Sequence, residues 1–469
     1  MGALMKFEPM STLAAAATPV LAMLLSACSF IPTYERPPAP VAATFPDAAA
    51  APGAGTAAAD MPWAEFITDA RLRVLVDTAL KNNRDLRIAT LNVEQVRAQL
   101  GLARADLLPT VGAGLVASST PSGGGNLRST SAGLTVSNFE LDLFGRVKSL
   151  SQAAAARYLA SDEGRRAAQV ALIAAVANVE LALRADDELL RITERTLASR
   201  EDALKLVRVR FDGGVSAEPE LRTADSLLAA ARASVAALRR QRAVDQNAMV
   251  LLLGQGVPAD LPAAAPLAES ALPAVPVGLP SEVLLQRPDI RQAEQQLMAA
   301  NANIGAARAA FFPRITLTGS AGFASSSLSG LFDNTVYSFT GQLLQPLFDA
   351  GRNQANLDAA RAGREIAVAQ YEKAIQSAFR EVADALAGRA TLGEQLAAQQ
   401  VQADAETRRL ALADLLFQGG IASALDRLDA ERSALAARQA VVQLQLAQQQ
   451  NAVLLYRVLG GGAGPAAAR

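Results

Sequence analysis

Residues 211–216 read Phe-Asp-Gly-Gly-Val-Ser, and residues 417–423 read Phe-Gln-Gly-Gly-Ile-Ala-Ser. Each stretch ends a run, 146–211 or 352–417, that holds no proline and is dominated by Ala, Leu, Arg, Glu and Gln, which favour helix. A glycine pair at the end of a helix supplies the left-handed backbone that closes it. The sequence therefore predicts two helices of roughly 100 Å, at about 1.5 Å per residue, each ending in a glycine turn.

The rest of the chain repeats at nearly the same interval. Residues 85–87 match 289–291 at an offset of 204 residues, and Phe211 matches Phe417 at an offset of 206, after a short insertion near 348–352. An offset held across several such landmarks predicts two copies of one structural unit. The predicted parts are a first copy over 63–254, a linker over 255–280, a second copy over 281–462 and a tail over 463–469.

Each copy is predicted to begin with a helix that leads into a β-hairpin. The first helix covers about 85–108, with Asp85 as its N-cap, and Pro109 stops it. The stretch that follows is rich in Gly, Ser, Thr and Val and alternates apolar with polar residues, which indicates strands with one face of each kind. We expect the two hairpins over about 110–144 and 314–348.

Alternation in the first hairpin is clearest near its end, where Phe139, Leu141 and Leu143 are separated by polar residues. Beyond each glycine turn, a shorter helix rich in Ala and Leu returns. We predict these return helices over about 216–253 and 422–459.

The amino terminus has the pattern of an export signal. An apolar stretch over 10–27 ends in Leu-Ser-Ala immediately before Cys28, the single cysteine of the chain. This resembles a bacterial lipobox, which implies that residues 1–27 are a signal peptide and that Cys28 carries the lipid. An ordinary signal peptide with an incidental cysteine is the alternative. Residues 28–62 are rich in Pro, Ala and Gly, so we expect a lipid-anchored extended tether.

Composition excludes several classes of function. The chain has 469 residues, a net charge of −1 and no histidine. Without histidine, Ser-His-Asp triads and HExxH zinc sites are impossible, and near-zero net charge argues against a nucleic-acid partner. We therefore expect no enzyme, no metal and no cofactor other than a covalent lipid on Cys28.

The predicted strands and helices impose a geometry on any membrane role. No segment after the signal offers 18 uncharged apolar residues, so we expect no transmembrane helix. Strands of roughly ten residues match a tilted span of the bilayer, but open sheet edges cannot lie in hydrocarbon and four strands cannot close a barrel. Several chains would therefore share one barrel. A soluble coiled-coil protein with short hairpins is the alternative.

Several stretches together resemble one family, the TolC-like outer-membrane factors, and within it the NodT-type lipoprotein branch. Trp63 and Phe66 resemble the family's entry into the first helix. The other stretches are 279–281 with 287–291, 302–313, 345–352 and 456–462. The resemblance implies a mostly α fold with a transmembrane β-barrel portion, built as a homotrimer with a shared twelve-stranded barrel and a periplasmic α-barrel of long antiparallel helices.

The resemblance also implies a function. The protein would be an outer-membrane exit duct that passively conducts substrates in a tripartite efflux system. Its partners would be a periplasmic adaptor (a membrane fusion protein), an inner-membrane pump of the RND type and outer-membrane lipid. A protein-secretion duct and a lipid-anchored envelope spacer without a pore are the alternatives.

Two groups of residues are candidates for functional roles. The resemblance assigns adaptor docking to the helix reversals. It assigns the narrowing of the closed tip to Leu425, Asp429 and Arg432, which the helical spacing places on one face. An ordinary solvated Asp–Arg pair is the alternative for the last two. Thr223 aligns with Asp429 in the first copy, so the two tips need not be equivalent. The docking candidates are Phe211, Gly213, Gly214, Val215, Ser216, Phe417, Gly419, Gly420, Ile421 and Ser423.

Overall fold

The computed structural model describes residues 29–46, 61–123, 125–269, 272–273 and 281–462. The signal segment and Cys28 lie outside the described residues, as do parts of the predicted linker and the tail. The chain divides into two compact units. The described residues of unit 1 fall within Met1–Pro38, Asn92–Asp162 and Gln292–Glu372, and those of unit 2 fall within Ala39–Leu91, Glu163–Arg291 and Lys373–Arg469.

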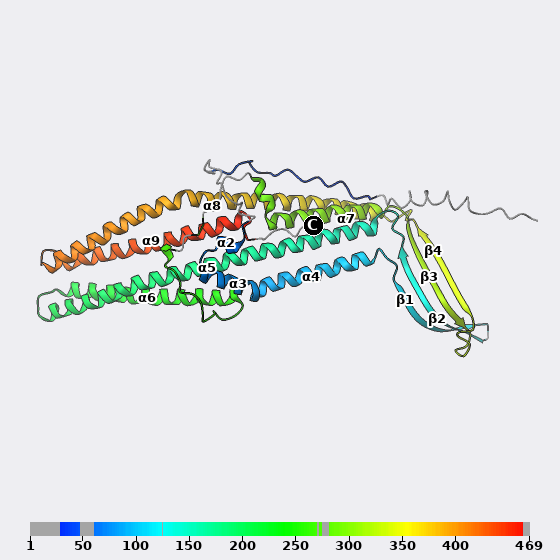
Figure 1. Cartoon of the computed structure of the whole chain (residues 1–469), viewed down its shortest axis with the longest axis horizontal. Helices are drawn as coiled ribbons and strands as arrows, with labels where there is room; N and C mark the ends of the chain where they lie inside the picture. The colour runs from blue at the N-terminus through cyan, green and yellow to red at the C-terminus, as the bar shows by residue number, and fades with distance from the viewer. Residues whose placement is uncertain (1–28, 47–60, 124, 270–271, 274–280, 463–469) are drawn as a thin grey trace, which may run out of the picture. The chain divides into compact units, whose positions relative to one another are not determined.

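Unit 1 contains one antiparallel sheet of four strands in the order β1-β2-β3-β4 (Figure 1). Strands β1 and β4 are its two edges. The hairpin β1–β2 comes from the first copy of the repeat and β3–β4 from the second. The strands are β1 (Val111–Ser122), β2 (Gly125–Glu140), β3 (Arg314–Ser325) and β4 (Thr335–Leu344).

The register separates the sheet into an apolar and a mainly polar face. On the apolar face, Leu134 lies opposite Ala321, which in turn lies opposite Tyr337. Tyr337 is 90% exposed, and Leu134 and Phe339 are exposed as well, so the described residues leave most of this face uncovered. The other face carries mostly Ser, Thr, Gly and Gln. Its apolar exceptions include Val116, Leu127 and Val336.

The end of β2 differs from the prediction. The strand stops at Glu140, so Leu141 and Leu143 lie beyond it. The register with β3 shifts between Val136 and Phe139, and Asn138 has a positive φ of 52°. Such a bulge interrupts strict alternation, which is why the sequence pattern suggested a longer regular strand.

The predicted tether is not free over residues 29–36. The Phe30 ring stacks on Phe312 at 4.6 Å, Pro32 accepts a 2.8 Å hydrogen bond from Asn301, and Arg36 makes a bidentate pair with Glu294 at 2.7 and 3.1 Å. This segment therefore lies along helix α7 (Pro288–Ala309). A Pro- and Ala-rich composition suggested an extended chain but contained no sign of this docking.

The long helices are α5 (Arg146–Asp212) and α8 (Arg352–Gln418), and each runs through both units. Both helices end one residue beyond the predicted ends at 211 and 417. In unit 2 they are accompanied by the return helices α6 (Glu218–Leu253) and α9 (Ala424–Val458).

Two short helices precede α4 (Arg84–Ala105), and the sequence analysis did not predict the second of them. They are α2 (Trp63–Phe66) and α3 (Ala70–Asn82). The predicted N-cap Asp85 is wrong, because the Asn83 side chain accepts the hydrogen bond from the Leu86 backbone at 2.9 Å. The same side chain donates to the Leu252 carbonyl at 2.9 Å, a tertiary contact that selects Asn83 as the cap.

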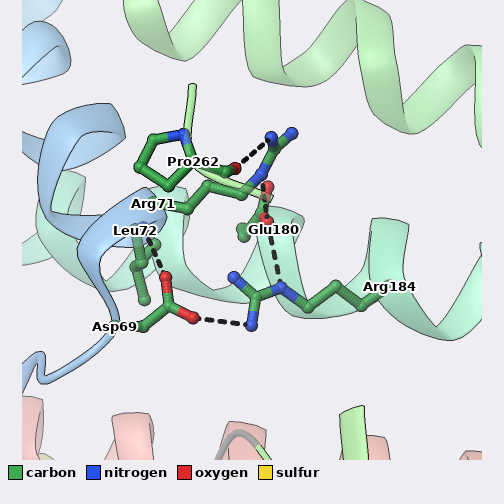
Figure 2. Close-up of polar contacts among 6 residues, drawn as sticks. All are labelled: Asp69, Arg71, Leu72, Glu180, Arg184 and Pro262. Carbon is green, nitrogen blue, oxygen red and sulfur yellow. Dashed lines mark hydrogen bonds and ion pairs between the residues drawn. The ribbon is translucent and has the colours of Figure 1, made fainter. Parts of the chain in front are cut away.

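A buried ion-pair cluster holds α3 against α5 in unit 2 (Figure 2). Asp69 caps α3 by accepting from the Leu72 backbone at 2.8 Å and also accepts from Arg184 at 3.0 Å. Glu180 accepts from the Nε atoms of Arg71 and Arg184, at 2.9 and 3.0 Å. The side chains of Glu180 and Arg184 are 2% and 4% exposed, so each charge depends on the others for solvation.

Within the described residues, α5 also contains the one stretch that is apolar enough to cross a membrane by length and composition, with a mean hydropathy of 1.5. The sequence prediction, which required an uncharged stretch, did not include it. Half of the stretch is buried within the chain.

Candidate functional site: the two helix reversals

The two helix reversals have the same backbone geometry. In the first, Gly213 N donates to the Val209 carbonyl at 3.1 Å, and Val215 N donates to the Arg210 carbonyl at 2.8 Å. The equivalent bonds in the second are 3.0 and 2.9 Å long, from Gly419 N to Leu415 and from Ile421 N to Leu416.

A left-handed glycine completes each turn. The φ of Gly214 is 75° and that of Gly420 is 72°, a conformation that disfavours any side chain. The turns are thus Schellman-type helix ends, in which backbone amides satisfy the last carbonyls.

Both turns expose apolar side chains at matching positions. Val215 is 71% exposed and Ile421 is 80% exposed. Val209 and Leu415, six residues earlier in the preceding helices, are 69% and 65% exposed. Side chains that remain this exposed in one chain, at the same positions of both copies, make each reversal a small apolar surface.

Other predicted docking residues have structural roles within their own chain. The Arg427 guanidinium lies over the Phe417 ring at 5.7 Å and pairs with Asp414 at 2.6 Å. The hydroxyl of Ser423 accepts from the Asp426 backbone at 3.2 Å, while Asp426 accepts from the Ser423 backbone at 3.1 Å, which is a capping box.

The first turn lacks that cap. Ala217 is the N-cap of α6 and makes no side-chain bond, and Pro219 occupies the first turn of the helix. The neighbouring Ser216 hydroxyl instead bonds to the Glu220 carboxylate. The two reversals therefore share a backbone but differ in their polar side chains.

The three residues predicted to narrow the tip lie just beyond the second turn. Leu425 is 67% exposed. Asp429 accepts from Arg432 at 2.7 Å and from Arg409 of α8 at 3.5 Å. Within one chain the Asp429 charge is therefore already compensated by two arginines, in a cluster exposed to solvent.

In the first copy, the aligned Thr223 donates its hydroxyl to the Pro219 carbonyl at 2.8 Å. Asp225, two residues further along the chain, lies 3.7 Å from Arg222 and 4.0 Å from Arg208. The charge arrangement at the first tip thus differs from that at the second.

Sequence reasoning missed a buried ion pair near the tips. Arg200 of α5 and Glu431 of α9 approach to 3.9 Å, and each side chain is 8% exposed. Among the described residues, neither Glu431 oxygen has a hydrogen-bond partner, and burial raises the pKa of this carboxyl despite the attraction of Arg200. The residue pattern within a single helix could not have identified this pair, because its members lie on two different helices, α5 and α9.

Glu431 also lines an open groove of about 960 Å³ in unit 2. The groove walls include Glu188 and Thr196 of α5, Asp404 of α8 and Arg438 of α9. Its charges are of both signs, and none of the described residues form a group of three or more acidic or sulfur ligands that could hold a metal.

The matching family model, two relatives and one solved structure with a similar fold are all described as outer membrane proteins. The family described as "Outer membrane efflux protein" matches residues 75–255 and 279–461, one region in each copy of the repeat. The solvent efflux pump outer membrane protein SrpC of Pseudomonas putida is 46% identical over 95% of this chain and 97% of its own length.

Another relative, the outer membrane protein OprJ of Pseudomonas aeruginosa, is 43% identical over 94% of this chain and 95% of its own. A solved structure with a similar fold is the open state of the Neisseria gonorrhoeae MtrE outer membrane channel. It is 41% identical, has a TM-score of 0.87, and the match covers 93% of this chain and 99% of that one.

Proposed function

The chain belongs to the outer membrane efflux protein family, and from that premise we propose how its sheet, its helix reversals and its amino terminus serve the outer-membrane channel of an efflux system. The family and its relatives are transport channels. The mostly helical fold with a small sheet and the outer-membrane location agree with the sequence expectation. We also propose that the chain has no catalytic activity.

Three copies of the chain share one twelve-stranded barrel. The observation that supports this most strongly is the sheet itself, which has two edges, β1 and β4, and one exposed apolar face. In hydrocarbon, edge N–H and C=O groups without partners cost several kcal/mol each. Pairing β4 of one chain with β1 of the next removes every edge and leaves the apolar face toward lipid.

The helix reversals dock a periplasmic adaptor that links the channel to an inner-membrane pump of the RND type. Support comes from the exposed apolar positions at both turns, Val209 with Val215 and Leu415 with Ile421. The relatives' names place them in efflux pumps, and a pump component needs a surface for its neighbours.

Leu425, Asp429 and Arg432 narrow the closed tip of the trimer. Three copies of Asp429 around one axis would attract cations to a constriction. Arg409 and Arg432 pair with Asp429 within the chain. These ion pairs would have to weaken for three Asp429 carboxylates to face one axis.

Cys28 carries a lipid that anchors the chain in the outer membrane. Cys28 lies outside the described residues, but Phe30, two residues later, stacks on Phe312, which lies two residues before the start of β3. The docked segment therefore begins beside the end of the strands, where a lipid chain can enter the bilayer.

Efflux is favoured over protein secretion because the relatives are named as efflux pump components. A spacer without a pore is disfavoured by the match to an outer membrane channel over nearly the whole chain. Conductance of the purified full-length protein in planar bilayers tests the duct. Discrete channel openings are expected, and a protein that inserts but never conducts would contradict the proposal.

A further inference from the structure

The sheet contains one place where two strands approach too closely for any side chain. Gly133 of β2 and Gly322 of β3 are direct register partners on the mainly polar face. A Cβ atom at Gly133 would lie 2.5 Å from the Ala321 carbonyl oxygen and 2.8 Å from the Gly322 Cα. A Cβ atom at Gly322 would lie 2.1 Å from the Ala132 carbonyl oxygen.

The obstructing atoms are backbone, so a side-chain rotation cannot relieve the overlap. In an ordinary antiparallel pair, facing Cβ atoms are about 4.5–5.5 Å apart. A Cβ atom on either glycine would run into the backbone of the opposite strand. The two strands must therefore be tilted toward each other on the face to which these Cβ atoms would point. The sheet is therefore folded at this pair, with its concave side on the mainly polar face.

The close approach is confined to the β2–β3 seam. At the same level of the sheet, Gly114 of β1 pairs with Gly133, and a Cβ atom there would meet nothing within 4 Å. On the other side, Gly322 pairs with Val336, so β3–β4 accommodates a full side chain. The register shift between Val136 and Phe139 belongs to the same seam, and bulges of this kind increase local bending.

We propose that the β2–β3 seam is a crease, formed by Gly133 and Gly322, which concentrates the curvature that lets the four-stranded sheets of three chains close into one barrel. This inference rests on the proposed shared barrel. The seam joins the first copy of the repeat to the second, so each chain supplies one crease. The direction of folding places the Ser- and Thr-rich face inside and the Tyr337 face outside, independently of hydrophobicity.

The test uses three single variants of the full-length protein. Gly133→Ala and Gly322→Ala each introduce the blocked Cβ atom, and Gly114→Ala is the matched control, because it adds the same methyl group to the same face in open space. The measurements are the yield of conducting oligomer in planar bilayers and the helical circular dichroism signal. The seam variants are expected to lose at least tenfold in conducting oligomer, whereas the control retains the wild-type yield.

Seam variants that assemble and conduct like wild type would overturn the crease while leaving the duct intact. Loss in the Gly114→Ala control as well would also overturn it, because the effect would then not be specific to the seam. Failure of the wild-type protein itself to conduct would instead contradict the proposed function.

A second measurement decides the matter if the seam variants fail to fold. Spin labels on the outer face are placed at Leu134 with Ala321, beside the glycine pair, and at Thr130 with Ser325, farther along the same two strands. Both pairs lie on the same face of the same strand pair and therefore have the same hydrogen-bonding type. A crease that is concave inside spreads the outward side chains beside the glycines, so dipolar broadening should be weaker for the Leu134–Ala321 pair. Equal broadening for the two pairs would overturn the proposal. Any label taken up at Cys28 is common to both samples.

Discussion

The geometry of the cluster around Glu180 predicts how much a substitution at this residue destabilises the packing of α3 on α5. Glu180 is 2% exposed and accepts from Arg71 and Arg184, the latter 4% exposed. Glu180→Gln keeps the shape but removes the only charge that the two arginines share. Removing one partner of a buried ion pair typically costs about 3–5 kcal/mol. Because Asp69 still pairs with Arg184 at 3.0 Å, we expect the lower end, about 3 kcal/mol.

The matched control lies on the same helix. Glu188 pairs with Arg191, and their side chains are 36% and 46% exposed. An exposed pair of this kind contributes about 0–1 kcal/mol. Glu188→Gln therefore makes the same chemical change, two helical turns away, without burying an unpaired charge.

Hydrogen–deuterium exchange of the α3 amides, residues 70–82, measures the effect locally. About 3 kcal/mol corresponds to roughly hundredfold faster exchange through local opening. We expect that increase in Glu180→Gln and an increase of less than about fivefold in Glu188→Gln. If the two variants exchange alike in α3, the cluster does not hold this helix and the reasoning is refuted.

Three further predictions concern other sites. Burial and the neighbouring Asp245 raise the pKa of Asp186 to about 7, so its contribution to stability is present below about pH 4 and lost as pH rises through about 7. Asp186→Asn should stabilise the protein at pH 8 by about 1–3 kcal/mol and by little at pH 4, and denaturant midpoints that shift equally at both pH values would count against this. Asp429→Ala should loosen the closed tip and raise single-channel conductance, and an unchanged conductance argues against the constriction. Cys28→Ala should abolish incorporation of labelled fatty acid, and label that persists in the variant refutes acylation at this residue.

The elements that depend on local pattern were predictable from the sequence. The long helices follow from proline-free runs of helix-forming residues, and their ends follow from glycines that adopt positive φ at 214 and 420. Strand positions followed from alternation, except at the bulge near Asn138, where one extra residue breaks the period of two.

Features that depend on partners distant in sequence were not predictable. Asn83 caps α4 in place of Asp85 because it also reaches the Leu252 carbonyl. Arg36 lies on α7 because Glu294, far away in the sequence, accepts hydrogen bonds from two nitrogens of its guanidinium. The buried pair of Arg200 and Glu431 likewise joins two helices whose sequences do not indicate that they meet.

The candidate site shows the same division. Sequence placed the reversals and the spacing of Leu425, Asp429 and Arg432, but it could not show that Asp429 has a second arginine, Arg409, from the neighbouring helix. Nor could it show that Phe417 is held by Arg427 while Ile421 remains exposed.

The proposed duct requires three chains to close one barrel through the β1 and β4 edges. Native mass spectrometry of the purified protein, prepared from the same fraction that conducts in planar bilayers, tests this most directly. We expect a conducting species with three times the mass of the single denatured chain. A conducting species with the mass of one chain would contradict it, because four strands would then have closed a pore alone.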